Sequence, residues 1–598
     1  MVKLSDYVID FLTKTGVSTV FTLTGGGIMH LVESLGNSDL RYVCCHHEQA
    51  CSIAAQAYGL YAEGLGVCLV TTGPGGTNAL TGAAAAYADS TPVLFMTGQV
   101  KRDDFASLRG VRQYGAQEND IIAMARPVTK YAEVVMEPES ILYHLQKAVY
   151  LATHGRKGPV WLDIPLDVQA AMIAEADLAG FVPEEGKAPN QVGRAVEQTY
   201  KALAEAKRPL ILAGHGVMAA KAQSKLTELA AALNIPVMAT WRALSVFDAE
   251  NRLFFGSPGL QAPRYSNLIL QGADLLIVVG SRLDNMITAF NEEHFAFRAA
   301  KIVVDIDEQE IDKLKTPKVT KVVADAGDYL AEMLEQAPGF AKPDFSKWLA
   351  DCLSLKERFP IWQEKQPEQP PQECVDLYHA TRLISAHCAK DDVIVISSTS
   401  RCNTAGHMAF SHRSGQMTIS SMGMGAMGFA LPSAVGAYFA SGGKRPIVIE
   451  GDGSLQLNIQ ELQTIQTYKI PAKIFVFNNN GYAAIATMQE RNFDGHYVGC
   501  NPQSGVCMPD LEKIAGAYGI AYRRIEKNSE AETIIKQGLE AEGAVICDLI
   551  GSLKFDEIPK CTSSVNAEGK RVSALLENPY PFLADGEIEN IYRQMGCL

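Results

Sequence analysis

The segment from Ile447 to Gly481 limits the possible folds of this chain more than any other. Two short apolar, β-rich runs, Pro446 to Ile449 and Lys473 to Phe477, flank a stretch with helical periodicity. This order predicts a βαβ unit, in which a crossover helix joins two parallel strands. A chain organised around such a unit is expected to form parallel sheets covered by helices.

A polar turn follows each of the two predicted strands: Gly-Asp-Gly at residues 451–453 and Asn-Asn-Asn-Gly at residues 478–481. Because adjacent parallel strands end at the same edge of a sheet, we expect the two turns to lie side by side. The Asp452 carboxylate, the Asn479 amide oxygen and the Gly481 carbonyl then form a hard, low-charge set of ligands. Such a set suits Mg²⁺ that already holds a diphosphate, since Mg²⁺ prefers few protein ligands plus phosphate oxygens and water.

A Gly-Asp-Gly sequence alone is equally compatible with an ordinary tight turn. The spacing distinguishes the two interpretations, because Asp452 and Asn479 lie 27 positions apart (479 − 452), one strand–helix–strand unit. The sequence therefore predicts a metal-diphosphate site.

Length and composition exclude several classes of protein. With 598 residues the chain is too long to fold around a single hydrophobic core, so three or four domains are expected. The net charge of −14, without a basic run, argues against a nucleic-acid partner. No apolar segment reaches the ~18 residues of a membrane span, and the N-terminus reads as an amphipathic helix, so we expect a cytoplasmic protein without a membrane partner. Thirteen cysteines without a Cys-x-x-Cys pattern argue against disulfides and zinc.

Residues 1–175 alternate apolar strand patterns with helical patterns, which predicts a doubly wound α/β domain. Three loops at strand ends, residues 24–27, 46–50 and 73–78, are expected to converge on one crevice. Taken singly, each loop is also compatible with an ordinary helix-start turn. The predicted strands are Thr19–Leu23, Arg41–Cys45, Gly66–Thr72, Pro92–Gly98 and Pro159–Ile164.

Glu48 opens the predicted helix from Gln49 to Tyr61. An acid at this position is also explained as a structural cap that complements the helix dipole. The flanking residues, Val43 to Cys45 and Ala50 to Ala55, are apolar, which places the carboxylate in a dry crevice. Burial there raises proton affinity, so Glu48 is a candidate proton-transfer group.

A second α/β unit is predicted for residues 190–345, after a polar linker at 183–189. Its predicted strands, Pro209–Ala213, Ala273–Gly280 and Lys301–Asp305, end in turns that suit either a nucleotide or ordinary chain reversal.

A second linker, residues 364–372, precedes a third domain at residues 375–555. That domain contains the opening segment and, upstream, a Gly/Met loop at residues 421–428, followed by a helix. We predict that the C-terminal tail, residues 556–598, acts as a lid or a packing arm.

Together, Glu48, the Gly-Pro-Gly-Gly-Thr-Asn loop at 73–78, the Gly/Met loop and the Gly-Asp-Gly…Asn-Asn unit make the chain resemble the thiamin diphosphate (ThDP) dependent acetolactate synthase large subunits. The resemblance extends over residues 1–555. Further runs that are similar to this family lie at residues 97–100, 126–130, 155–160 and 428–432.

The resemblance implies an α/β protein of three doubly wound parallel-sheet domains. These are a pyrimidine-binding domain, a central domain that often holds FAD, and a domain that binds the diphosphate and Mg²⁺. In such enzymes ThDP lies between the first domain of one subunit and the third domain of another. A homodimer is then the smallest active unit, and a homotetramer is common.

The resemblance also implies residue roles. Glu48 would bond the pyrimidine ring and drive the proton relay, Gln117 would be a second catalytic residue, Gly425 would meet the aminopyrimidine, and Met427 would hold the cofactor bent. The implied metal ligands are Asp452, Asn479 and Gly481. Other implied ThDP contacts are Gly25, Gly26, Pro74, Asn78, Gly451, Gly453, Ser454 and Ile485. The implied FAD contacts are Arg156 and Arg282.

The sequence departs from the family where the acceptor substrate is expected. Met286 stands at the position of a family arginine, Met488 at that of a tryptophan, and Ala116 at that of a phenylalanine. Losing the guanidinium removes a carboxylate partner, and losing two rings enlarges the pocket. We therefore expect an acceptor other than 2-oxobutyrate, larger and uncharged at that end.

The leading hypothesis is a ThDP- and Mg²⁺-dependent carboligase, a transferase or lyase. It would decarboxylate pyruvate or a related 2-oxo acid and pass the acyl anion to a carbonyl acceptor such as a keto sugar. The alternatives are a genuine acetolactate synthase, a non-ligating 2-oxo-acid decarboxylase and a catalytically silent scaffold. The resemblance leaves open whether the chain binds FAD, because the family's Met-His-Gly loop is replaced near residues 256–260.

Overall fold

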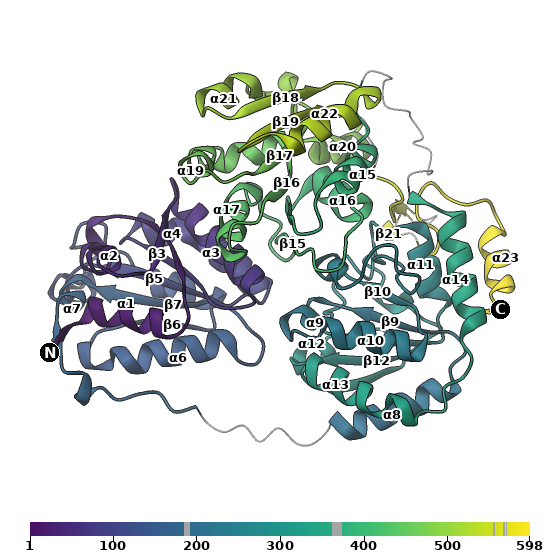
Figure 1. Cartoon of the computed structure of the whole chain (residues 1–598), viewed down its shortest axis with the longest axis horizontal. Helices are drawn as coiled ribbons and strands as arrows, with labels where there is room; N and C mark the ends of the chain where they lie inside the picture. Colours follow the sequence, from purple (N-terminus) through teal and green to yellow (C-terminus); the bar gives the residue numbers. More distant parts are fainter. Residues whose placement is uncertain (184–191, 362–373, 554–556, 566–568, 570, 574) are drawn as a thin grey trace.

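The computed structural model describes residues 1–183, 192–361, 374–553, 557–565, 569, 571–573 and 575–598. Three parallel sheets, each flanked by helices, form three lobes (Figure 1). This arrangement confirms the predicted α/β fold class. The two predicted linkers lie outside the described residues, except for Pro183.

The N-terminal sheet has the order β3-β2-β4-β5-β7-β6, with parallel pairing throughout. Its strands are β2 (Thr19–Leu23), β3 (Arg41–Cys44), β4 (Gly66–Val70), β5 (Val93–Gln99), β6 (Tyr131–Val134) and β7 (Val160–Pro165). Its helices are α1 (Leu4–Lys14), α2 (Met29–Gly36), α3 (Glu48–Ala62), α4 (Pro74–Ala88), α5 (Ile121–Ala125), α6 (Ile141–Thr153) and α7 (Leu166–Gln169). A short antiparallel pair joins β1 (Val2–Lys3) to β8 (Met172–Ile173).

Alternation along β4 explains why this sheet carries helices on both faces. Val67 and Leu69 join the core under α1, α2 and α6, whereas Cys68 and Val70 join the core under α3 and α4. All four side chains are fully buried. Because successive side chains of a strand point to opposite faces, an uninterrupted apolar strand needs cover on both faces.

The central sheet has the order β10-β9-β11-β12-β13, again parallel. Its strands are β9 (Pro209–Ala213), β10 (Val237–Ala239), β11 (Leu275–Val279), β12 (Ala300–Asp305) and β13 (Val319–Val323). Its helices are α8 (Val192–Glu205), α9 (His215–Ala219), α10 (Gln223–Leu233), α11 (Arg264–Gly272), α12 (Glu308–Asp312), α13 (Ala326–Gln336) and α14 (Ser346–Arg358), with the 3₁₀ segment η7 (Trp241–Val246).

The C-terminal sheet has the order β15-β14-β16-β17-β19-β18. Its strands are β14 (Val393–Ile396), β15 (Thr418–Ile419), β16 (Pro446–Gly451), β17 (Lys473–Asn478), β18 (Ala521–Ile525) and β19 (Val545–Ile550). Its helices are α15 (Leu377–His387), α16 (Ser400–Ala409), α17 (Ala430–Ala440), α18 (Asp452–Leu455), α19 (Glu461–Thr467), α20 (Ala483–Phe493), α21 (Leu511–Ala517) and α22 (Asn528–Glu540). Strands β16 and β17 pair in parallel, so the predicted βαβ unit is confirmed.

The N-terminal and C-terminal domains share one hydrophobic core at the packing of α3 on α17. Gly436 makes this close approach possible, because a Cβ there would lie 2.1 Å from the Ala54 carbonyl oxygen. On the other side of α3, a Cβ at Gly82 of α4 would lie 2.1 Å from the Ser52 hydroxyl oxygen. Glycines therefore let α3 sit tightly between two neighbouring helices.

The C-terminal tail packs on the central domain, beside α11 and α14 (Figure 1). Arg264 of α11 donates to the Pro579 and Pro581 carbonyl oxygens at 3.1 and 2.5 Å. Gln271 donates to the buried Glu577 carboxylate at 2.9 Å. The tail contains the antiparallel pair β20 (Ser563–Val565) and β21 (Arg571–Ser573) and ends in α23 (Glu587–Gln594). Of the two predicted roles, the contacts support a packing arm.

Across the described ranges, no helix has the length and apolar character needed to cross a membrane.

Candidate functional site

The turns after β16 and β17 lie side by side and meet at Asp452. The backbone N–H groups of Asn479 and Gly481 donate to Asp452 Oδ2 at 3.0 and 3.2 Å. Asn480 adopts a left-handed conformation with φ of +56°, which curls the second turn around this carboxylate. The structure therefore brings together the three predicted metal ligands.

The chemistry of this group fits a divalent cation. Asp452 is 2% exposed, and burial raises its pKa to about 6 although backbone N–H groups oppose the shift. Asn479 Oδ1 is buried and has no hydrogen-bond partner among the described residues. Buried polar atoms normally have a hydrogen-bond partner. A bound metal ion would explain why this amide oxygen, beside a buried carboxylate, has none.

The Gly/Met loop (residues 421–428) is tied to the Gly-Asp-Gly turn. The Gly428 N–H donates to Ser454 Oγ at 2.9 Å. A Cβ at Gly453 would lie 2.4 Å from the Tyr482 ring, so this position accepts only glycine without a shift of that ring. Position 451 has more space, since a Cβ there would contact only Cys402 Sγ, at 3.4 Å.

The middle of the Gly/Met loop is open. Gly425 has a φ of +63°, and a Cβ there would approach only the Ser398 carbonyl oxygen, at 3.7 Å. Met427 is partly buried, and Met424 is exposed. A ligand can therefore reach this stretch of backbone.

Glu48 occupies the first turn of α3 and is 8% exposed. Asn78 Nδ2 donates to Glu48 Oε2 at 2.9 Å, so α4 supplies the partner of the buried carboxylate. Pro74 begins α4, and its fixed φ suits the first helical position. The structure thus joins Glu48 and Asn78, two predicted site residues.

The remaining predicted residues of the N-terminal domain lie on neighbouring loops. A Cβ at Gly25 would lie 2.6 Å from Thr71, whereas Gly26 has open space around it. Gln117 adopts a left-handed conformation (φ of +65°) and packs against Gly73, where a Cβ would lie 2.4 Å from the Gln117 carbonyl oxygen. The Gln117 side chain is exposed.

The Glu48 group and the Asp452 group do not touch directly within the described chain. Asn458 connects their neighbourhoods, since its Nδ2 donates to Gln49 Oε1 at 3.0 Å and to the Gly428 carbonyl oxygen at 2.7 Å.

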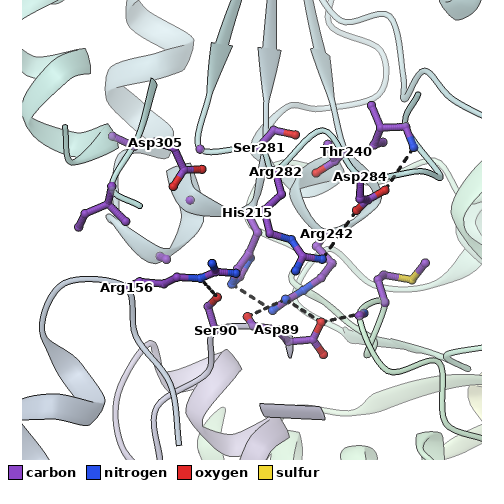
Figure 2. A pocket seen from close by; sticks show the side chains of 18 of the residues that line it. Asp89, Ser90, Arg156, His215, Thr240, Arg242, Ser281, Arg282, Asp284 and Asp305 are labelled. Carbon is purple, nitrogen blue, oxygen red and sulfur yellow. Dashed lines mark hydrogen bonds and ion pairs between the residues drawn. The ribbon is translucent and has the colours of Figure 1, made fainter. Parts of the chain in front are cut away.

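A large pocket lies at the carboxyl edge of the central sheet and encloses about 1350 Å³, its open mouth included. Figure 2 shows Arg156 entering it from the N-terminal domain and Arg282 from the turn after β11. Arg156 donates to Asp307 and Glu310, each at 2.7 Å. The two predicted FAD residues therefore line one cavity.

The pocket occupies the topological switch point of its sheet, between β9 and β11, where open α/β sheets bind ligands. Asp305 ends β12 and also lines the cavity, and burial raises its pKa. An acid near such a strand end is suited to binding ribose hydroxyls.

Two pocket residues were not predicted from the sequence: Asp89 and Arg242. His215 lies directly after the β9 turn residue Gly214, in one of the turns predicted to suit either a nucleotide or chain reversal. Asp89 and Arg242 form a buried ion pair at 3.2 Å, and Arg242 Nη2 lies 3.0 Å from His215 Nε2. The available signal was a charged residue, Asp89, three positions after the alanine-rich run at 83–86, and another, Arg242, three positions after the apolar run at 237–239.

Comparison with protein families places three matches in order along the chain. They are the N-terminal TPP binding domain at residues 2–124, the central domain at 196–333 and the C-terminal TPP binding domain at 399–549, all of thiamine pyrophosphate enzymes. The chain belongs to the thiamine pyrophosphate enzymes.

Acetolactate synthases are relatives of this ThDP enzyme over most of its length. Acetolactate synthase 1 (chloroplastic) of Oryza sativa subsp. japonica is 32% identical over 92% of this chain and 84% of the relative. The acetolactate synthase large subunit of Cyanidium caldarium is 31% identical over 91% and 92%. That of Porphyra purpurea is 30% identical over 90% of each chain. The family resemblance seen in the sequence is confirmed.

The three positions that the resemblance predicts to depart from the family, Ala116, Met286 and Met488, lie on exposed surfaces. On α20, Met488 is 46% exposed, and the predicted ThDP contact Ile485 is 40% exposed. Met286 is 39% exposed and lines the central pocket, and Ala116 lies in the exposed loop before Gln117.

Proposed function

We propose that this ThDP enzyme is a Mg²⁺-dependent carboligase that decarboxylates pyruvate or a close relative and transfers the acyl group to a carbonyl acceptor. One observation carries the proposal: the buried Asp452 carboxylate lies beside an Asn479 amide oxygen that lacks a partner. Asp452, Asn479 and the Gly481 carbonyl would hold Mg²⁺, with the diphosphate at Gly451, Gly453 and Ser454. ThDP, when bound, supplies a nucleophilic carbon and an electron sink for the loss of CO₂.

The protein would supply position, a proton relay and a dry site. Glu48 would hold and move a proton at the pyrimidine ring, with Asn78 fixing its carboxylate. Gly425 and Met427 would contact the aminopyrimidine and the bent cofactor. In support, the Gly425 backbone is open to a ligand.

We place the complete site at a subunit interface of a homodimer or homotetramer, with Glu48 of one copy serving the Asp452 group of another. Supporting this, the two groups make no direct contact within the described residues of one chain, although each is largely buried. The exposed apolar side chains Ile485 and Met488 lie on α20, the helix that follows the Asn479 turn, and suit burial against a partner. The net charge and thirteen free cysteines fit a small-molecule enzyme of the reducing cytosol.

We propose an acceptor larger than a 2-oxo acid and uncharged where the family binds a carboxylate, such as a keto sugar. In support, Met286 and Met488 present flexible apolar side chains where the family has an arginine and a tryptophan. Methionine carries no charge, so position 286 cannot bind an acceptor carboxylate as the family's arginine would.

The central pocket favours a second ligand, FAD or a related nucleotide. Arg156 and Arg282 offer cations for a diphosphate, and Asp305 offers a carboxylate for ribose. A yellow purified protein with a flavin absorption spectrum would identify FAD; a colourless one would leave a flavin-free nucleotide or an empty pocket.

The deciding experiment is mass spectrometry of the products formed from pyruvate, ThDP and Mg²⁺ with a panel of aldehydes, ketones and keto sugars. A new C–C adduct with a panel member supports the proposal. Acetolactate from pyruvate alone indicates a genuine acetolactate synthase, aldehyde alone indicates a non-ligating decarboxylase, and no CO₂ indicates a silent scaffold.

A Glu48→Gln variant tests the proton relay. Its decarboxylation rate is expected to fall about 10²- to 10⁴-fold, the usual contribution of general acid–base catalysis. Glu139→Gln is the matched control, because Glu139 is an exposed acid at the start of another helix. Full CO₂ release by Glu48→Gln would refute the assignment.

A further inference from the structure

Asp89 lies where the three domains meet. It follows the last residue of α4 and is 4% exposed. From the N-terminal domain, Gln56 Nε2 donates to Asp89 Oδ2 at 3.0 Å. From the central domain, Arg242 Nη1 lies 3.2 Å from Asp89 Oδ1. From the C-terminal domain, the Gly423 N–H donates to the same Oδ1 at 3.0 Å. One buried carboxylate therefore contacts all three domains.

The contact with Gly423 fixes the middle of the Gly/Met loop. The loop lies directly on the end of α4, because a Cβ at Gly423 would come within 2.8 Å of Ala88 Cβ and 3.1 Å of Asp89 Oδ1. The loop ends are held within their own domain, by Ser398 Oγ at Ser421 N and by Ser454 Oγ at Gly428 N. Among the described residues, Asp89 is the only residue of another domain that forms a hydrogen bond with residues 422–427, by accepting from the Gly423 N–H.

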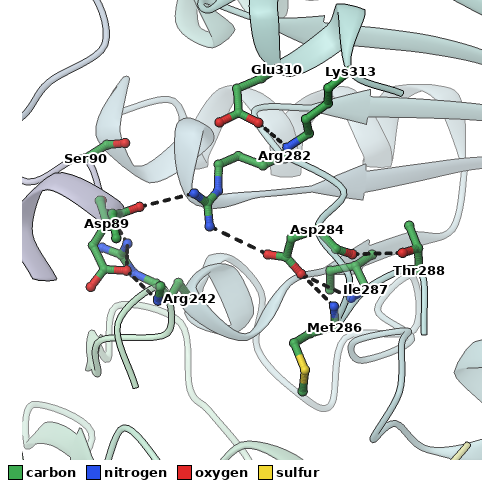
Figure 3. A network of polar contacts seen from close by, with 12 residues as sticks. Asp89, Ser90, Arg242, Arg282, Asp284, Met286, Ile287, Thr288, Glu310 and Lys313 are labelled. Carbon is green, nitrogen blue, oxygen red and sulfur yellow. Dashed lines mark hydrogen bonds and ion pairs between the residues drawn. The ribbon is translucent and has the colours of Figure 1, made fainter. Parts of the chain in front are cut away.

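Arg242 orients the carboxylate of Asp89 through the ion pair between them (Figure 3). The guanidinium also donates to the Asp89 carbonyl oxygen, at 2.9 Å, so it contacts both the side chain and the backbone of Asp89. Burial lowers the pKa of Arg242, and the negative charge of Asp89 opposes that shift. A charge-assisted hydrogen bond from a backbone N–H to such a carboxylate is about twice as strong as a neutral one.

We propose that Asp89 is a positioning residue that holds the Gly/Met loop in the conformation that receives ThDP. The proposal rests on the proposed function, in which Gly425 and Met427 of this loop contact the cofactor. Through Arg242 and His215, which line the central pocket, the same carboxylate joins the wall of that pocket to the cofactor loop.

The test compares Asp89→Asn with wild type in the full-length protein. The carboxamide has nearly the shape of the carboxylate but no charge, and its NH₂ group cannot accept the bond from Gln56. We expect the dissociation constant for ThDP at saturating Mg²⁺ to rise about tenfold, with kcat at saturating ThDP within about twofold of wild type. Hydrogen exchange of the peptide containing residues 421–428 should become faster, whereas that of β16 should not.

Asp284→Asn is the matched control. Asp284 lies in the same central pocket and faces Arg282 at 3.8 Å, but it makes no contact with the Gly/Met loop among the described residues (Figure 3). Its substitution should leave ThDP affinity and loop exchange unchanged. Equal weakening of ThDP binding by the two variants would overturn the proposal, because it would indicate a general effect on the pocket.

A second variant, Gln56→Met, tests the proposal if Asp89→Asn does not fold. It removes one hydrogen bond to Asp89 but keeps the ion pair with Arg242, so we expect a rise of about threefold in the ThDP dissociation constant. Wild-type affinity and wild-type loop exchange in a folded variant would overturn the proposal. Wild-type protein that binds no ThDP would instead refute the proposed function, which separates the two failures.

Discussion

Asp163 should make the stability of the N-terminal domain fall as the pH rises. It lies in β7, is 1% exposed, and accepts hydrogen bonds from Thr97 Oγ1 at 2.7 Å and Gln99 Nε2 at 2.9 Å. No cation faces it among the described residues. Burial therefore raises its pKa from 3.8 to about 7, although the two hydrogen bonds oppose the shift.

The sign and size of the effect follow from the two pKa values. Because the folded pKa lies above the unfolded one, the protonated carboxyl stabilises the fold at low pH, and this contribution is lost as the pH rises through about 7. For a shift from 3.8 to about 7, the loss between about pH 5 and pH 8 is about 2.5 kcal/mol of unfolding free energy. An Asp163→Asn variant removes this term and should show a correspondingly flatter pH dependence.

Trp161 offers a local probe, because it is the only tryptophan in residues 1–175 and its Nε1 donates to Thr97 Oγ1 at 2.9 Å. Urea unfolding of wild type and Asp163→Asn, each with the other three tryptophans changed to phenylalanine, would be followed by Trp161 emission across this pH range. Contributions from other groups cancel in the difference between the two chains. Parallel stability curves would refute the reasoning, since they would mean that Asp163 is charged in the fold at neutral pH.

Three further predictions concern the metal group, the tail and the domain interface. Asn479→Leu keeps the side-chain size but removes Oδ1, so calorimetric titration should show Mg²⁺-dependent ThDP binding weakened more than about tenfold; unchanged affinity would argue against this ligand. Burial alone would raise the pKa of Glu577, but its hydrogen bonds to His294 at 3.0 Å and to Gln271 at 2.9 Å together outweigh burial and lower the pKa, so the stabilisation from the charged carboxylate is lost as the pH falls. Glu577→Gln should therefore cost about 3 kcal/mol near neutral pH and less in acid, measured by thermal unfolding; a pH-independent cost would contradict this. Gly436→Ala should separate α17 from α3 at the Ala54 carbonyl and destabilise the chain by about 1–3 kcal/mol, seen as faster limited proteolysis than in Gly516→Ala, where a Cβ on helix α21 has open space.

Buried strands were the most predictable part of the fold. The predicted strand Thr19–Leu23 coincides with β2, because a parallel strand covered on both faces is a continuous apolar or β-branched run. Of the edge strands, β3 was predicted as Arg41–Cys45, but others were missed. Tyr131–Val134 and Val319–Val323 lie at sheet edges and are partly exposed, so polar residues such as Glu133 and Lys321 interrupt their pattern.

The arrangement around Asp452 was predictable because the βαβ unit fixes which strands are neighbours, and hence which turns meet. The cluster around Asp89 was not. Arg242 lies 153 positions away along the chain, and Gly423 lies 334 positions away. Nothing local distinguishes these residues from surface charges or turn glycines, since their contacts arise only where the three domains pack together.

The path of the C-terminal tail has a consequence for domain exchange between related enzymes. The tail follows the third sheet in the chain, yet its buried side chains Leu576, Ile591 and Tyr592 complete the core of the second. Arg208, at the start of β9, also donates to the Gly596 carbonyl oxygen at 2.9 Å. A chimera that transplants the central domain therefore has to carry residues 557–598 with it, although some two hundred positions separate the two segments.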